Sequence, residues 1–119
     1  MQRFLIAGDH YIVRSGISLL IKEAILNVEI DECRDGYCIQ HKLNAYNYDL
    51  AIIDVSMPST DPVNLLRKIF DRWPHLKILI LACKDTFITK YQQMGVRGFI
   101  DKGAEGSDIL QTIMAILNT

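Results

Sequence analysis

The chain has 119 residues, of which 50% are hydrophobic and 23% are charged, and its formal net charge is -1. These values are typical of one globular domain that can bury a core without cross-links. Direct binding of nucleic acid or of an anionic membrane has no support, because such partners require clustered Lys and Arg.

Five short apolar runs alternate with longer segments of helical periodicity. The runs that we predict to be strands are Arg3 to Ala7, Val28 to Cys33, Leu50 to Val55, Leu76 to Ala82 and Arg97 to Asp101. Apolar residues recur at spacings of three and four within 12–24, 39–46, 63–70 and 109–117. Strand followed by helix, repeated, predicts βαβ units and a parallel sheet covered by helices on both sides.

The rest of the chain is consistent with one intracellular domain. Cys33, Cys38 and Cys83 have neither C-x-x-C spacing nor the pattern of a disulfide framework, so we expect small hydrophobic residues in a reducing cytoplasm. No apolar stretch reaches the length of a membrane span, and "MQRFLIAGD" breaks too early for a signal peptide. The chain ends directly after a helical pattern, which is typical of a module from a larger protein. Arg67, Lys68 and Arg72 are expected on a solvated helix face.

Charged residues follow three of the predicted strands. Asp9 follows the first, Asp54 ends the third within "DLAIIDVSMP", and Lys102 follows the fifth. Parallel strands deliver their carboxyl ends to one edge of the sheet, where open α/β sheets bind ligands. We therefore expect these three side chains to lie together. By the same geometry, Trp73 and His75 belong to the opposite edge.

Two carboxylates and backbone carbonyls are the ligands that Mg²⁺ prefers in a protein. A lysine opposite them supplies a positive charge for a phosphoryl group, and an aspartate can itself form an aspartyl phosphate. The pattern therefore predicts that Asp54 is a phosphoryl acceptor held by a rigid strand. The chain has no G-x-G-x-x-G motif after the first strand and no P-loop lysine, so nucleotide binding lacks support.

Each residue also has an ordinary structural interpretation. Asp9 fits an N-terminal helix cap, Asp54 fits a loop stabilised through its own backbone, and Lys102 fits an exposed loop lysine. The shared position at strand ends favours one common site. His10 is expected to be a solvated residue at the start of a helix.

Three segments together resemble the receiver domain of two-component response regulators, of the kind joined to a LuxR-type helix-turn-helix output domain. They are "GDHYIVRSGISLLI", "DLAIIDVSMP" and "GVRGFIDKG". The resemblance spans the chain and implies a flavodoxin-like αβα sandwich with strand order 2-1-3-4-5 and five helices. It also implies phosphorylation of Asp54 by a histidine kinase, charge neutralisation by Lys102, and Mg²⁺ held by Asp9, Asp54 and the backbone carbonyl of Ser56.

The same resemblance implies a cytoplasmic protein that contacts DNA only through an output domain outside residues 1–119, and it leaves a homodimer open. Regulation of transcription follows from the resemblance alone.

The chain departs from the family pattern at two positions. Gly8 stands where the family has the first of two adjacent acids, so we expect weaker Mg²⁺ binding. Ala82 replaces the Thr or Ser at the end of the fourth strand, whose hydroxyl contacts the phosphoryl group in the family. A hydrogen bond to a charged group is worth about 1.5 to 3 kcal/mol, so the active state loses roughly a factor of ten to a hundred in population.

Smaller departures concern three other residues. Cys83 is bulkier than the small residue usual beside the acceptor, and Pro62 replaces a common Gly and fixes φ before the third helix. Phe99 is the aromatic switch position without a hydroxyl, and an ordinary core or surface aromatic is an equal interpretation.

Three functions are compatible with these residues: a phosphorylatable receiver, a degenerate receiver that binds partners without phosphate, and an aspartate-nucleophile phosphatase. Gly8 and Ala82 motivate the second. The third lacks the second acid of a D-x-D pattern, because Ser56 stands there. Asp9, Asp54 and Lys102 favour the first.

Overall fold

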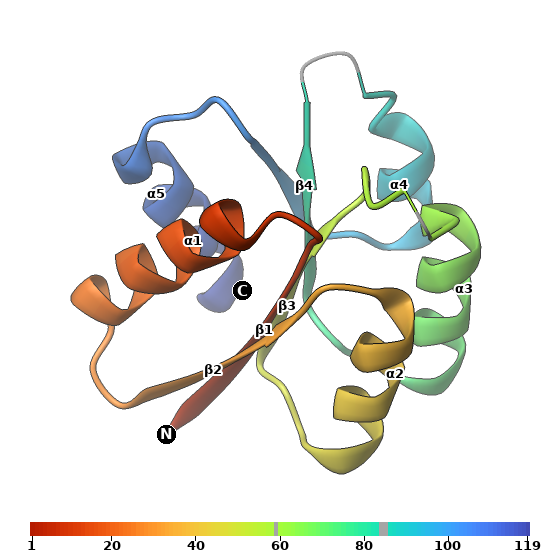
Figure 1. The fold of residues 1–119 in the computed structure, drawn as a ribbon, viewed down its shortest axis with the longest axis horizontal. Coiled ribbons are helices and arrows are strands. Elements are labelled where there is room, and N and C mark those ends of the chain that lie inside the picture. The colour runs from red at the N-terminus through yellow and green to blue at the C-terminus, as the bar shows by residue number, and fades with distance from the viewer. Residues whose placement is uncertain (59, 84–85) are drawn as a thin grey trace.

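The computed structural model describes residues 1–58, 60–83 and 86–119 as a parallel sheet flanked by helices (Figure 1). The strands are β1 (Gln2–Ala7), β2 (Val28–Cys33), β3 (Leu50–Asp54), β4 (Ile78–Ala82) and β5 (Gly98–Asp101). The helices are α1 (Tyr11–Ala24), α2 (Gly36–Ala45), α3 (Pro62–Arg72), α4 (Thr89–Met94) and α5 (Gly106–Leu117). The sheet order is β2-β1-β3-β4-β5, which confirms the predicted topology.

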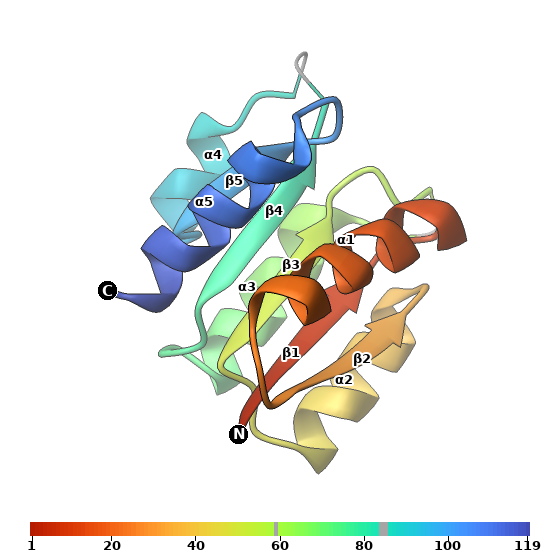
Figure 2. The same cartoon turned by 90° about the vertical axis from the view of Figure 1, so that its left-hand side faces the viewer.

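Two helical layers cover the sheet. Figure 2 shows α1 and α5 on the near face and α2, α3 and α4 behind it. Side chains of β3 alternate between the two cores, since Leu50 and Ile52 pack with α1 and α5 while Ala51 and Ile53 pack with α2 and α3. All five residues of β3 are buried, as expected for a strand covered on both faces. β3 is therefore a rigid support for whatever follows it.

Local signals determine where the helices begin and end. The Asp35 carboxylate accepts a hydrogen bond from the backbone N–H of Cys38 and caps α2, and Asp61 caps α3 directly before Pro62. α4 has six residues and ends at Gly95, whose φ of 112° favours glycine. Arg67, Lys68 and Arg72 of α3 are exposed, as predicted.

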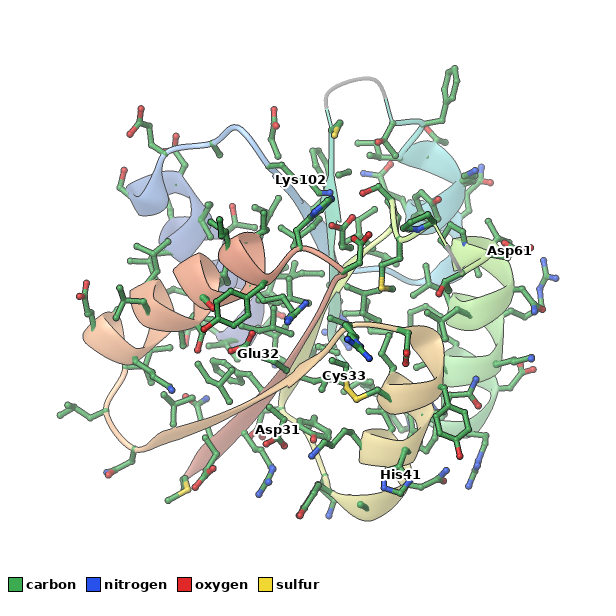
Figure 3. All side chains as sticks on the ribbon, in the orientation of Figure 1. Asp31, Glu32, Cys33, His41, Asp61 and Lys102 are labelled. Carbon is green, nitrogen blue, oxygen red and sulfur yellow. A yellow bond between two sulfur atoms is a disulfide. The ribbon has the colours of Figure 1, made fainter. Side chains whose placement is uncertain are left out.

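The prediction that the cysteines are unpaired was wrong for two of the three. Cys33 and Cys38 form a disulfide, with their Cα atoms 5.5 Å apart, and Figure 3 shows the bond at the end of β2. The loop after β2 leads directly into α2, and the first helical turn of α2 lies back over the end of β2. Cys83 is free and exposed. Among the described helices, none is long and apolar enough to cross a membrane.

Candidate functional site

Asp54 is the last residue of β3 and is buried, with 1% of its surface exposed. Its carboxylate lies at the carboxyl edge of the sheet, beside the end of β4, because Asp54 pairs with Leu81 in the strand register. Oδ1 accepts hydrogen bonds from the backbone N–H of Ser56 at 2.8 Å and from its hydroxyl at 2.7 Å. The loop interpretation of Asp54 is therefore also correct, since the carboxylate stabilises the turn that follows it.

Lys102 follows β5 and supplies the positive charge at this acid. Its ammonium nitrogen lies 2.6 Å from Oδ2 of Asp54, and its side chain is 18% exposed. In Figure 3 the lysine points into the space above the strand ends. The ammonium lies outside the direction of a hydrogen bond to Oδ2, which has no hydrogen-bond donor within the described part of the chain. Oδ2 is thus buried and paired with the ammonium by charge.

Ser56 connects the acid and the lysine. Lys102 Nζ donates to Ser56 Oγ at 2.6 Å, and the same hydroxyl donates to Oδ1 of Asp54. Sequence reasoning used only the backbone carbonyl of Ser56 and missed this hydroxyl. The D-x-S spacing was the available signal, because a serine two residues after an aspartate can reach its carboxylate through a turn.

Asp9 is less closely tied to the site. Oδ1 of Asp9 lies 3.7 Å from Nε2 of His10, and within the ranges described no hydrogen bond or ion pair joins Asp9 to Asp54 or Lys102. His10, and not Asp9, is the N-cap residue of α1, and its side chain makes no cap hydrogen bond. His10 is solvated, as expected. The cap interpretation of Asp9 was wrong, and its carboxylate has no capping role to fulfil.

Gly8 faces the acceptor directly. A Cβ added at Gly8 would lie 3.2 Å from Cβ of Asp54 and 3.5 Å from its Oδ2. The missing acid would therefore have stood beside the reactive oxygen. Arg14 of α1 donates to the Gly8 carbonyl and, at 3.1 Å, to Glu32 of β2, so it fixes this loop to the sheet.

The two switch positions lie on β4 and β5. Ala82 ends β4 and is buried, so its methyl group offers no hydrogen bond where the family has a hydroxyl. Phe99 is 42% exposed and lines a groove with Val96 and Gln92. The structure thus places Phe99 as a partly exposed aromatic. Trp73 and His75 line a separate groove with Tyr46, away from Asp54.

The residues present suit a hard divalent cation. Buried Oδ2 of Asp54 accepts no hydrogen bond from the part of the chain that the structure describes, and Gly8 leaves beside it the volume that a side chain would fill. Carboxylate and backbone carbonyl oxygens, the donors that Asp54 and Ser56 offer, are the ligands that Mg²⁺ prefers. Among the described residues no group of three or more His, Cys, Asp or Glu is placed to hold a metal.

Comparison with known proteins gives a consistent family. The family model of the response regulator receiver domain matches residues 4–114. The transcriptional regulatory protein DegU of Brevibacillus brevis is 25% identical, covering 96% of this chain and 49% of that protein. The oxygen regulatory protein NreC of Staphylococcus aureus is 29% identical, covering 96% of this chain and 54% of that protein. The chain thus spans about half the length of these relatives.

Solved structures give the same fold. The isolated REC domain of RcsB from Salmonella enterica serovar Typhimurium, determined in the presence of the phosphomimetic BeF3⁻, matches with a TM-score of 0.88. It is 24% identical, and the match covers 98% of this chain and 88% of that chain. At this identity the likeness shows the fold alone.

Proposed function

This chain is a receiver domain of the two-component response regulator family, and we propose that it accepts a phosphoryl group on Asp54 from a histidine kinase. The observation that carries the proposal is the pairing of buried Asp54 with Lys102 at 2.6 Å, with no hydrogen bond to Oδ2 from residues 1–58, 60–83 or 86–119. A carboxylate in this environment is a nucleophile next to a fixed positive charge.

The transfer is an in-line displacement. Oδ2 of Asp54 donates an electron pair to phosphorus, while the bond between phosphorus and the donor's imidazole nitrogen breaks and that nitrogen keeps its electrons. Lys102 already lies beside Oδ2 and stabilises the negative charge on the phosphoryl oxygens without moving far. No further acid or base is required from the chain, because the leaving imidazole takes its proton from water.

Asp9, Asp54 and the backbone carbonyl of Ser56 would hold the Mg²⁺ ion. When bound, the ion neutralises charge on the phosphoryl oxygens and on the acceptor. Because Gly8 stands in place of an acid, the site has one carboxylate ligand fewer. We therefore expect its affinity for Mg²⁺ to be weaker than that of a site with three acids. The proposal accordingly requires millimolar rather than trace Mg²⁺, since magnesium sites that depend on few carboxylates bind weakly.

Phosphorylation would act on the surface formed by β4, β5 and their helices. Ala82 and Phe99 occupy the switch positions there, and neither side chain has a hydroxyl. We propose that phosphorylation raises the population of the active state only slightly. The output would then also depend on binding of a partner or of a second copy of the chain.

The remaining partners follow from the family. The proposed donor is a histidine kinase, and DNA is contacted only through an output domain beyond these residues, as the name of the transcriptional regulatory protein DegU suggests. We propose a cytoplasmic location, where the Cys33–Cys38 bond is open to reduction by cellular thiols.

The proposal is tested with a small acyl phosphate donor, Mg²⁺ and intact-protein mass spectrometry. We expect one phosphoryl adduct on the wild-type chain and none on Asp54→Ala. An adduct that persists in Asp54→Ala would place the acceptor elsewhere. A wild-type chain that takes no phosphoryl group would favour the phosphate-independent interaction module, and steady release of phosphate from generic esters would favour a phosphatase.

A further inference from the structure

We infer that the side-chain hydroxyl of Ser56 is the donor that holds the phosphoryl group on Asp54, in the role that Ala82 cannot fill. This inference rests on the proposed phosphorylation of Asp54. It assigns to Ser56 a function beyond its backbone carbonyl, and it makes Ser56 a positioning and binding residue for the phosphoryl oxygens.

The first ground is the position of the hydroxyl between the two charged groups. Ser56 Oγ lies 2.7 Å from Oδ1 of Asp54 and accepts from Lys102 Nζ at 2.6 Å. A group bonded to Oδ2 beside Lys102 brings its oxygens into the neighbourhood of this hydroxyl, because both carboxylate oxygens belong to the same small group. Ser56 is exposed, so its side chain can rotate without disturbing the core.

The second ground is that Oδ1 can release the hydroxyl at little cost. A serine hydroxyl has a single proton to donate, so donation to a phosphoryl oxygen requires the present bond to Oδ1 to break. The backbone N–H of Ser56 still donates to Oδ1 at 2.8 Å after that change. The carboxylate therefore remains satisfied on one oxygen while the hydroxyl moves to the more highly charged acceptor, where a hydrogen bond is stronger.

The third ground is that Ala82 and Cys83, the last residues described at the end of β4, offer few hydrogen-bond donors. Ala82, at the end of β4, presents a buried methyl group, and Cys83, which follows it, has only a weak S–H donor. Lys102 alone cannot satisfy three phosphoryl oxygens. A hydroxyl on the adjacent loop supplies a second side-chain donor without any change in the sheet.

The test measures the affinity of the chain for beryllofluoride, with Mg²⁺ present, by calorimetry. Ser56→Ala should bind beryllofluoride about 10-fold to 100-fold more weakly than the wild type, the range expected when a hydrogen bond to a charged group is lost. Ser56→Thr keeps the hydroxyl, so its affinity for beryllofluoride should stay within about threefold of the wild-type affinity. Ser107→Ala, an exposed serine at the start of α5, is the matched control for loss of a surface hydroxyl.

A second measurement separates this role from general damage to the site. The affinity for Mg²⁺ alone should change much less in Ser56→Ala than the affinity for beryllofluoride, because the backbone carbonyl is retained. Equal losses for the two ligands, or losses of similar size in Ser56→Ala and Ser56→Thr, would overturn the assignment.

The result also distinguishes the inference from the proposed function. Wild-type affinity retained in Ser56→Ala would overturn the role of the hydroxyl while phosphorylation of Asp54 stands. A wild-type chain that binds no beryllofluoride and forms no adduct with an acyl phosphate would remove the proposed function, and the inference with it.

Discussion

The ammonium of Lys102 lies 2.6 Å from Oδ2 of Asp54, and the two residues come from opposite halves of the chain. Asp54 is 1% exposed, and a buried carboxylate is costly unless a positive charge compensates it. The positive charge of Lys102 therefore has two roles. It permits an acid at the end of a fully buried strand, and it prepares the same oxygen to receive a negatively charged group.

Replacing Lys102 by Met should destabilise the fold by about 3 to 5 kcal/mol, because it leaves the buried Asp54 carboxylate without the positive charge that pairs with it. Asp54→Asn in the same background should recover most of that loss, since a neutral amide needs no countercharge. Urea unfolding of the wild type, both single variants and the double variant gives the coupling energy. Additive effects of the two substitutions would contradict the idea that the lysine compensates the acid.

Replacing Gly8 by Asp should convert a weak magnesium site into a stronger one. The new Cβ would lie 3.2 Å from Cβ of Asp54, so the variant should be less stable than the wild type without metal. With Mg²⁺ the added carboxylate should tighten binding by at least about tenfold, or about 1.4 kcal/mol. Titration of the melting temperature with MgCl2 measures both effects.

The neutral variant Gly8→Asn is the control for Gly8→Asp, because it adds nearly the same volume without the charge. Equal responses of the two variants to Mg²⁺ would show that the metal does not bind beside residue 8.

Introducing a hydroxyl at the end of β4 should raise the affinity of the chain for a phosphoryl mimic. Ala82→Thr should bind beryllofluoride about 10-fold to 100-fold more tightly, corresponding to about 1.5 to 3 kcal/mol for a hydrogen bond to a charged group. Because Ala82 is buried, any larger side chain disturbs the packing. Ala82→Val has the same shape as the threonine without the hydroxyl, so the ratio of the two affinities isolates the hydrogen bond. A ratio near one would remove residue 82 from phosphoryl recognition.

The fold was predictable because its strands are buried on both faces. Continuous apolar runs such as that of β3 mark such strands, and the helices between them have clear periodicity. The exception is α4, which has six residues and only Tyr91 buried, too few for a periodic pattern. Its existence followed from the resemblance and not from its own residues.

The part of the candidate site that could be predicted is the part that depends on where the strands end. Parallel strands bring their ends to one edge, so Asp54 and Lys102 could be placed together from the sequence. Side-chain direction does not follow from that rule, which is why the Ser56 hydroxyl and the contact of Asp9 with His10 were missed. The Cys33–Cys38 pair was missed because it depends on how tightly the chain turns from β2 into α2.

Reduction of the disulfide should lower the stability of the chain modestly. Cys33 and Cys38 close a loop of only a few residues, for which loop entropy predicts a stabilisation of about 2 kcal/mol. Unfolding with and without dithiothreitol measures the difference, and Cys83→Ser, at the exposed free cysteine, removes competing disulfide exchange. An equal stability of both forms, or three reactive thiols in the oxidised, denatured wild-type chain, would contradict the bond.

A polar cluster at the opposite edge of the sheet predicts a pH dependence of stability. Asp31 Oδ2 accepts hydrogen bonds from the hydroxyl of Tyr48 at 2.5 Å and from Nε of Arg3 at 2.9 Å. Burial alone would raise the pKa of Asp31, but the hydrogen bonds from Tyr48 and Arg3 together outweigh it and hold that pKa below its ordinary value of 3.8. Burial first, and then the Asp31 hydrogen bond, raise the pKa of Tyr48, so its hydroxyl remains a donor.

A carboxyl group whose pKa is lower in the folded state stabilises the protein above its unfolded pKa, and that contribution is lost as the pH falls through the folded pKa. Tyr48→Phe should therefore cost about 1.5 kcal/mol at neutral pH, the lower value for a hydrogen bond to a charged group. The difference from the wild type should shrink as the pH falls below the ordinary pKa of Asp31, which is 3.8. Urea unfolding at a series of pH values measures it.

Tyr46→Phe is the matched control for Tyr48→Phe. The Tyr46 ring packs against the Arg3 guanidinium, whose central carbon lies 3.7 Å from the ring centre, and the substitution removes the hydroxyl but keeps that ring. We expect Tyr46→Phe to show no comparable pH dependence. A cost for Tyr48→Phe that stayed constant from neutral to acid pH would assign the effect to packing of the ring, since the hydroxyl can stabilise Asp31 in this way only while the carboxylate is charged.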